Sequence, residues 1–207
     1  MAFHQPFQII GFHSCDREVG LRMVNGKDQL KPSYNPWDWL GPGVYFWEEN
    51  PYKALQYAEK CANRKQKFSG EIHTPLVIGA IIELRNCLNL IEPNSINIVK
   101  EAFSNLKRRM DQAGETLPEN KKANRERDCA VIKYVHESNK RTGLAPYDTI
   151  RSPFHEGKEI YDQANFTDGL HMEICVINPE CIKGYFLPQP LEQFNPYLNK
   201  EFIPAQK

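Results

Sequence analysis

The segment from Trp37 to Trp47 restricts the fold of this chain more than any other stretch. Its centre, Gly41-Pro42-Gly43, combines the two residue types that favour tight turns, and the aromatic and β-branched residues from Val44 to Trp47 favour a strand. Three tryptophans in eleven residues are more than a solvated turn requires. Such rings either line a pocket for a flat ligand or pack in a buried corner, and the segment alone leaves both interpretations open.

Two other strand-like runs carry ionisable residues in apolar surroundings. The run 7–15 ends in His13-Ser14-Cys15, and the run 171–178 contains Glu173 two residues after His171. Because side chains alternate along a strand, His171 and Glu173 are expected on one face. A carboxylate there could stabilise developing positive charge or orient a nucleophile. The alternative interpretations are that His13 is a structural histidine and that Glu173 is an exposed strand residue.

Taken in order, these segments resemble the diphtheria-toxin-like branch of the ADP-ribosyltransferases, which includes the poly(ADP-ribose) polymerases. The resemblance rests on a strand histidine, a turn-strand tyrosine, a helix after an Asn-Pro pair and a late strand glutamate: His13, Tyr45 in Gly43-Val44-Tyr45-Phe46, Tyr57 on the helix after Asn50-Pro51, and Glu173. It implies a split β-sheet with NAD as co-substrate and Glu173 as the catalytic residue.

The same resemblance implies roles for the NAD-binding residues. His13 would donate a hydrogen bond to the adenosine ribose, and Tyr45 and Tyr57 would stack on the two faces of the nicotinamide ring. Ser14 stands where the family usually has glycine, and its backbone would hold the nicotinamide carboxamide.

The loop that precedes the glutamate strand meets the acceptor in this family. His171, Phe154 and His155 are therefore expected on the acceptor side. Arginine-modifying relatives carry a second acid where this chain has His171, so modification of arginine is not supported.

Composition narrows the remaining classes of function. The 26 basic and 26 acidic residues balance, so the whole chain has no charge that favours nucleic acid, although the local basic excess in 107–127 could meet a phosphate backbone or form a solvated helix face. The six cysteines form no Cys-x-x-Cys motif, so we expect free thiols and no metal. No apolar stretch approaches the ~20 residues that span a bilayer, and we expect a cytoplasmic protein with no membrane partner.

The order of the expected elements predicts an α+β fold, with strands at both ends of the chain around central helices. Strands are expected near 7–13, 75–84, 87–91, 147–151, 158–161, 171–178 and 182–187, besides the strand of Tyr45. Helices are expected after Asn50, after an N-cap at Asn94 or Ser95, and over 124–140. Residues 14–36 are expected to be turn-rich. One catalytic domain over 1–190 and a C-terminal tail over 191–207 complete the prediction.

Together these features predict a mono-ADP-ribosyltransferase that transfers ADP-ribose from NAD to a protein or nucleic acid. A toxin or defence-type effector, with an antitoxin or regulatory partner, is the biological role that the resemblance suggests. A NAD glycohydrolase and an inert module that binds NAD or ADP-ribose are the alternatives. A tRNA 2′-phosphotransferase is disfavoured by the acidic Glu173.

Overall fold

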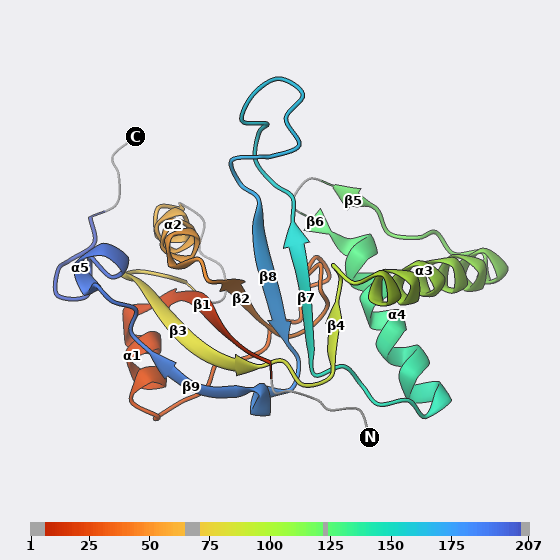
Figure 1. Cartoon of the computed structure of the whole chain (residues 1–207), viewed down its shortest axis with the longest axis horizontal. Helices are drawn as coiled ribbons and strands as arrows, with labels where there is room; N and C mark the ends of the chain where they lie inside the picture. Colours follow the sequence, from red (N-terminus) through yellow and green to blue (C-terminus); the bar gives the residue numbers. More distant parts are fainter. Residues whose placement is uncertain (1–6, 65–70, 122–123, 204–207) are drawn as a thin grey trace. The chain divides into compact units, whose positions relative to one another are not determined.

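The computed structural model describes residues 7–64, 71–121 and 124–203 (Figure 1). Strands and helices both contribute extensively to them, which confirms the α+β class. The described residues divide into two compact units. The first unit contains those up to Leu30, those from Phe46 to Glu83 and those from Ile182 onward, and the second contains Lys31–Tyr45 and Leu84–Cys181.

The first unit is an antiparallel sheet with strand order β2-β1-β3-β9, accompanied by three helices. Its elements are β1 (Gln8–Asp16), α1 (Arg17–Val24), β2 (Val44–Glu48), α2 (Pro51–Ala62), β3 (Pro75–Glu83), β9 (Ile182–Phe186) and α5 (Leu191–Phe194). The first two residues of β2 belong to the second unit.

The pairing of β1 with β3 forms the centre of the first unit. Its register runs from Gln8 opposite Glu83 to Asp16 opposite Pro75. β3 is a nearly continuous apolar run, as a strand that is covered on both faces requires. Its fully buried side chains are Leu76, Val77, Ile78, Ala80 and Ile82.

Helix α2 begins where the sequence predicts. The Asn50 side chain accepts a hydrogen bond from the backbone N–H of Lys53 at 2.9 Å, and Pro51 lies in the first turn. Ala54 faces inward and packs against Phe12 of β1 and Val77 of β3. This packing holds the helix beside the strand that carries His13.

In the second unit, strands β4, β7 and β8 lie in that order, with β4 parallel to β7 and β7 antiparallel to β8, and β5 and β6 form a separate antiparallel pair. Its elements are β4 (Cys87–Asn89), α3 (Pro93–Ala113), β5 (Asn120–Lys121), β6 (Asn124–Arg125), α4 (Glu126–Thr142), β7 (Thr149–Phe154), β8 (His171–Val176) and the 3-10 turn η1 (Pro179–Cys181). In Figure 1 the loop between β7 and β8 projects beyond the two strands that it connects.

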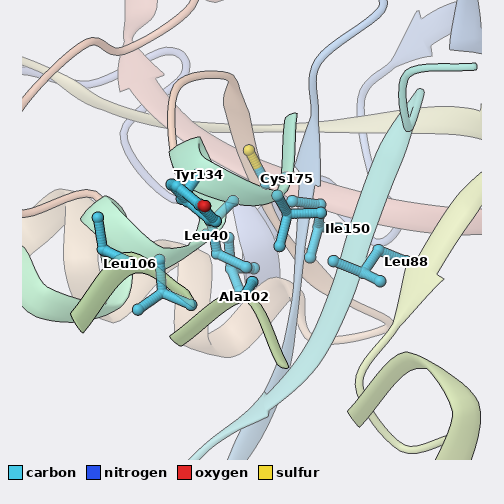
Figure 2. Close-up of a cluster of buried hydrophobic side chains, with 10 residues drawn as sticks. Leu40, Leu88, Ala102, Leu106, Tyr134, Ile150 and Cys175 are labelled. Atoms are coloured by element: carbon cyan, nitrogen blue, oxygen red, sulfur yellow. The ribbon is translucent and has the colours of Figure 1, made fainter. Parts of the chain in front are cut away.

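The core of the second unit lies where its two long helices meet its strands (Figure 2). Ala102 and Leu106 of α3, Tyr134 of α4 and Ile150 of β7 converge there on Leu40. Leu40 has no solvent-exposed surface. The turn segment from Trp37 to Gly43 is therefore anchored in this core by Leu40, and the partly buried Trp39 ring packs against the same cluster.

Several sequence predictions about local structure are wrong. Residues 17–24 form helix α1 instead of a turn, because Asp16 ends β1 and caps the helix, accepting a hydrogen bond from the N–H of Glu18 at 3.0 Å. Helix α3 begins at Pro93 after Glu92, one or two residues before the predicted cap. The predicted strand near 158–161 is reduced to a bridge between Glu159 and Thr167.

The predicted C-terminal tail is described over residues 191–203. It forms helix α5, and the next residue, Asn195, is buried. The Asn195 side chain accepts a hydrogen bond from the backbone N–H of Val77 at 2.7 Å and donates one to the carbonyl of Val77 at 3.0 Å. These two bonds attach the segment to β3 of the first unit.

Candidate active site

Each carboxylate oxygen of Glu173, in β8, has a nitrogen partner in the second unit. Its Oε2 accepts a hydrogen bond from Trp39 Nε1 at 2.6 Å, and its Oε1 lies 2.9 Å from His171 Nε2. The side chain of His171 is 2% exposed and that of Glu173 is 14% exposed. The carboxylate is thus held between two nitrogen atoms while the Glu173 side chain still reaches solvent.

Strand geometry explains why these groups meet. His171 and Glu173 are two residues apart in β8, so their side chains leave the same face, as the sequence predicts. The β7–β8 register places Phe154 opposite His171. The Phe154 ring lies 5.4 Å from the His171 ring and 4.7 Å from the Trp39 ring, measured between centroids. Aromatic rings therefore border the Glu173 carboxylate.

The turn before β2 positions Trp39. Gly41 adopts a positive φ of 78°, and its N–H donates to the carbonyl of Asp38 at 2.7 Å. A positive φ is easiest for glycine, which has no Cβ. With Leu40 buried in the core, its neighbour Trp39 is directed to Glu173, which lies 134 positions further along the chain.

Tyr45 closes the same turn. Its hydroxyl donates to the carbonyl of Gly41 at 2.8 Å and accepts from the N–H of Leu40 at 3.0 Å. Its ring packs against the core of the second unit. Burial raises the pKa of the Tyr45 hydroxyl far above its usual value, and the nearby Cys175 and Asp38 add to the shift. The phenol therefore stays protonated as a structural donor.

The other predicted NAD-binding residues belong to the first unit. His13 in β1 is half-buried, and its ring centroid lies 5.7 Å from that of Phe46. Ser14 is buried, and its hydroxyl donates to the backbone carbonyl of Ala54 in α2. Tyr57 in α2 is exposed, with its ring centroid 5.2 Å from that of Trp47. The stacking of Tyr45 and Tyr57 on one nicotinamide ring stays a prediction.

The structure brings some of the predicted residues together and adds one. Phe154, His171 and Glu173 form one cluster, whereas His155 is exposed at the start of the β7–β8 loop. Sequence reasoning did not single out Trp39 as a partner of Glu173. The available signal was the density of tryptophan in the segment 37–47, which does not show which ring faces the acid.

Two further observations concern metals and membranes. All six cysteines are free thiols, and Cys15, Cys129, Cys175 and Cys181 are buried. Within residues 7–64, 71–121 and 124–203, no three His, Cys, Asp or Glu side chains are grouped as a metal ion would require. Among the helices of these same ranges, none has the length and apolar character needed to cross a bilayer.

Comparison with known proteins gives one similarity of low identity. An uncharacterized protein from Methanocaldococcus jannaschii is 23% identical over an aligned length of 205, and the match covers 88% of this chain and 90% of that protein. No family model matches the chain. No solved structure matches it.

Proposed function

We propose that the protein cleaves the nicotinamide–ribose bond of NAD and transfers ADP-ribose to a macromolecular acceptor, with Glu173 as the catalytic residue. The observation that carries the proposal is the Glu173 carboxylate. It accepts a hydrogen bond from Trp39 and lies 2.9 Å from His171 Nε2, and the Phe154 ring packs against both of these rings. The Glu173 side chain is 14% exposed to solvent. The order of His13, Tyr45 and Glu173 along the chain, which resembles that of the ADP-ribosyltransferases, adds to it.

The chemistry requires one carboxylate. When the bond between nicotinamide and ribose C1′ breaks, nicotinamide leaves as a neutral base from a cationic one, so the leaving group needs no general acid. Positive charge spreads over the ribose ring as in glycoside hydrolysis, and a carboxylate that accepts a hydrogen bond from the 2′-hydroxyl binds this state more tightly than the substrate. The acceptor nucleophile then attacks C1′ and loses its proton to Glu173 or to solvent.

The NAD-binding roles follow the resemblance. His13 would bind the adenosine ribose, the Ser14 backbone would hold the carboxamide, and the Tyr45 and Tyr57 rings would stack on nicotinamide. Because the Tyr45 hydroxyl bonds to the turn, Tyr45 would contribute only its ring to the ligand. The Ser14 hydroxyl bonds to Ala54, so only the Ser14 backbone can serve the ligand.

The acceptor side would include Phe154 and His155, at the start of the β7–β8 loop. The acceptor is a protein or a nucleic acid, and transfer stops after one ADP-ribose. A cytoplasmic toxin or defence-type effector, with an antitoxin or regulatory partner, is the role that fits this activity.

The test uses isotope-labelled NAD with separate pools of RNA, DNA and cellular protein. Free nicotinamide is measured by chromatography and transferred label by gel analysis. Glu173→Gln is the inactive reference, and Glu180→Gln is the control, since Glu180 is an exposed acid whose Oε2 pairs with Arg85 at 2.9 Å. We expect nicotinamide release and labelling of one pool, both lowered about 10²- to 10³-fold in Glu173→Gln.

Other outcomes separate the alternatives. Nicotinamide release without labelling of any pool would indicate a NAD glycohydrolase. NAD binding without release would indicate an inert binding module. The absence of both binding and release at millimolar NAD would refute the proposal.

A further inference from the structure

We infer that His171 and Trp39 act as a two-donor clamp on Glu173, with one proton held between His171 Nε2 and Glu173 Oε1. Trp39 and His171 are then positioning residues that keep Glu173 ionised and in one orientation. The effect on the reaction rate rests on the proposed function. The hydrogen-bond arrangement is a property of the ligand-free protein and is testable without NAD.

The number of protons on the His171 ring follows from the hydrogen-bond partners of its two nitrogens. His171 Nδ1 lies 2.6 Å from the backbone carbonyl of Gly169, and a carbonyl oxygen only accepts, so Nδ1 carries a hydrogen. The other nitrogen, Nε2, lies 2.9 Å from a carboxylate oxygen. Two lone pairs cannot face each other at that distance, so a proton lies between these atoms. The indole N–H of Trp39 on Oε2 favours the anion, and with it an imidazolium–carboxylate pair over a neutral pair.

Burial explains the need for two donors. The Glu173 side chain is largely shielded from water, and a shielded carboxylate requires hydrogen-bond donors in place of the water that it loses. His171 and Trp39 supply one donor to each oxygen. An ionised pair inside a protein is retained when its remaining hydrogen-bonding positions are satisfied, as the Gly169 carbonyl does for His171.

The clamp is itself held rigidly. Trp39 is fixed by the buried Leu40 beside it and by its contact with the Phe154 ring. His171 is fixed by its hydrogen bond to Gly169 and by its contact with the Phe154 ring. Each carboxylate oxygen has two lone pairs, so one position on each oxygen is left for a ribose hydroxyl or a nucleophile. The clamp thus fixes the direction in which the remaining lone pairs of the Glu173 oxygens point.

Two substitutions at His171 separate its two hydrogen bonds. In His171→Gln the side-chain amide reaches the position of Nε2 and keeps a donor for Glu173. In His171→Asn the amide matches Nδ1, keeps the bond to Gly169 and loses the donor for Glu173. We expect His171→Asn to lower kcat about 10- to 100-fold with little change in KM, and His171→Gln to recover most of that loss. His73→Gln, at an exposed histidine of the first unit, is the control and should be unchanged.

The tryptophan is tested in the same way. Trp39→Phe keeps a ring against Phe154 and removes the donor to Oε2, so we expect about a 10-fold loss in kcat. Trp37→Phe, at an exposed tryptophan two residues earlier, should have no effect. Equal loss in His171→Asn and His171→Gln, or full activity in His171→Asn and Trp39→Phe, would overturn the clamp.

A spectroscopic measurement tests the proton directly. In ¹⁵N-histidine NMR of the ligand-free protein, both ring nitrogens of His171 should carry protons. In Glu173→Gln the amide can donate to Nε2 and accept from Trp39, so His171 should become neutral with its proton on Nδ1 alone. An Nε2 signal that is the same in both proteins would overturn the shared proton. If the NMR result holds while no variant or parent turns over NAD, the proposed function fails and the clamp stands.

Discussion

Replacing Tyr45 by phenylalanine tests whether its hydroxyl holds the turn that presents Trp39. The hydroxyl makes two hydrogen bonds, to the Gly41 carbonyl at 2.8 Å and from the Leu40 N–H at 3.0 Å. Tyr45→Phe removes this hydrogen-bond partner from two backbone groups, which belong to the buried residues Leu40 and Gly41. An unsatisfied buried group costs about 1–3 kcal/mol, so we expect the free energy of unfolding to fall by that amount.

The assay is urea denaturation followed by circular dichroism at neutral pH, with Tyr34→Phe as the control, because Tyr34 is 73% exposed. The ring remains in Tyr45→Phe, so stacking on nicotinamide would persist and NAD affinity should change little. Tyr45→Phe should also lose less stability than the parent above pH ~10. The raised pKa of Tyr45 keeps the folded phenol protonated while the unfolded chain ionises, which favours unfolding as pH rises. This role would be refuted if the free energy of unfolding of Tyr45→Phe lay within about 0.5 kcal/mol of the parent's, which is the spread of neutral surface substitutions.

The remaining predictions concern catalysis, packing and alkaline stability. Glu173→Gln should fold and bind NAD while nicotinamide release falls about 10²- to 10³-fold, and turnover within threefold of the parent would move the catalytic acid elsewhere. Gly43→Ala should destabilise the protein by about 1–3 kcal/mol in urea denaturation, because the added Cβ would lie 2.7 Å from the Val176 carbonyl oxygen. Gly184→Ala, with open space around it, should be nearly neutral. Equal effects of the two substitutions would contradict this packing. Burial raises the pKa of the Cys15 thiol from 9.0 to about 12. The free energy of unfolding should therefore be retained below pH 9 and fall by about 1.4 kcal/mol per pH unit above it. Cys15→Ala should make this fall with pH less steep.

Much of the secondary structure is encoded locally and could be predicted. The apolar run of β3 and the Asn50-Pro51 start of α2 lie where periodicity and capping place them. The shared face of His171 and Glu173 follows from strand alternation alone. Local rules do not predict helix α1, because Asp16 lies in a polar passage of the sequence. Its role as a cap depends on the hydrogen bonds that it accepts from the backbone N–H groups of Glu18, His73 and Thr74.

The sequence by itself determined the class of fold, the strand that carries Glu173 and the presence of a histidine on its face. Only the tertiary structure decided that Trp39 bonds to the same carboxylate, that the Phe154 ring contacts both Trp39 and His171, and that Asn195 attaches the C-terminal segment to β3. Local rules depend on neighbours within a few residues, whereas Trp39 and Glu173 are 134 positions apart. Their contact depends on the direction of a turn, which the burial of Leu40 and the positive φ of Gly41 establish together.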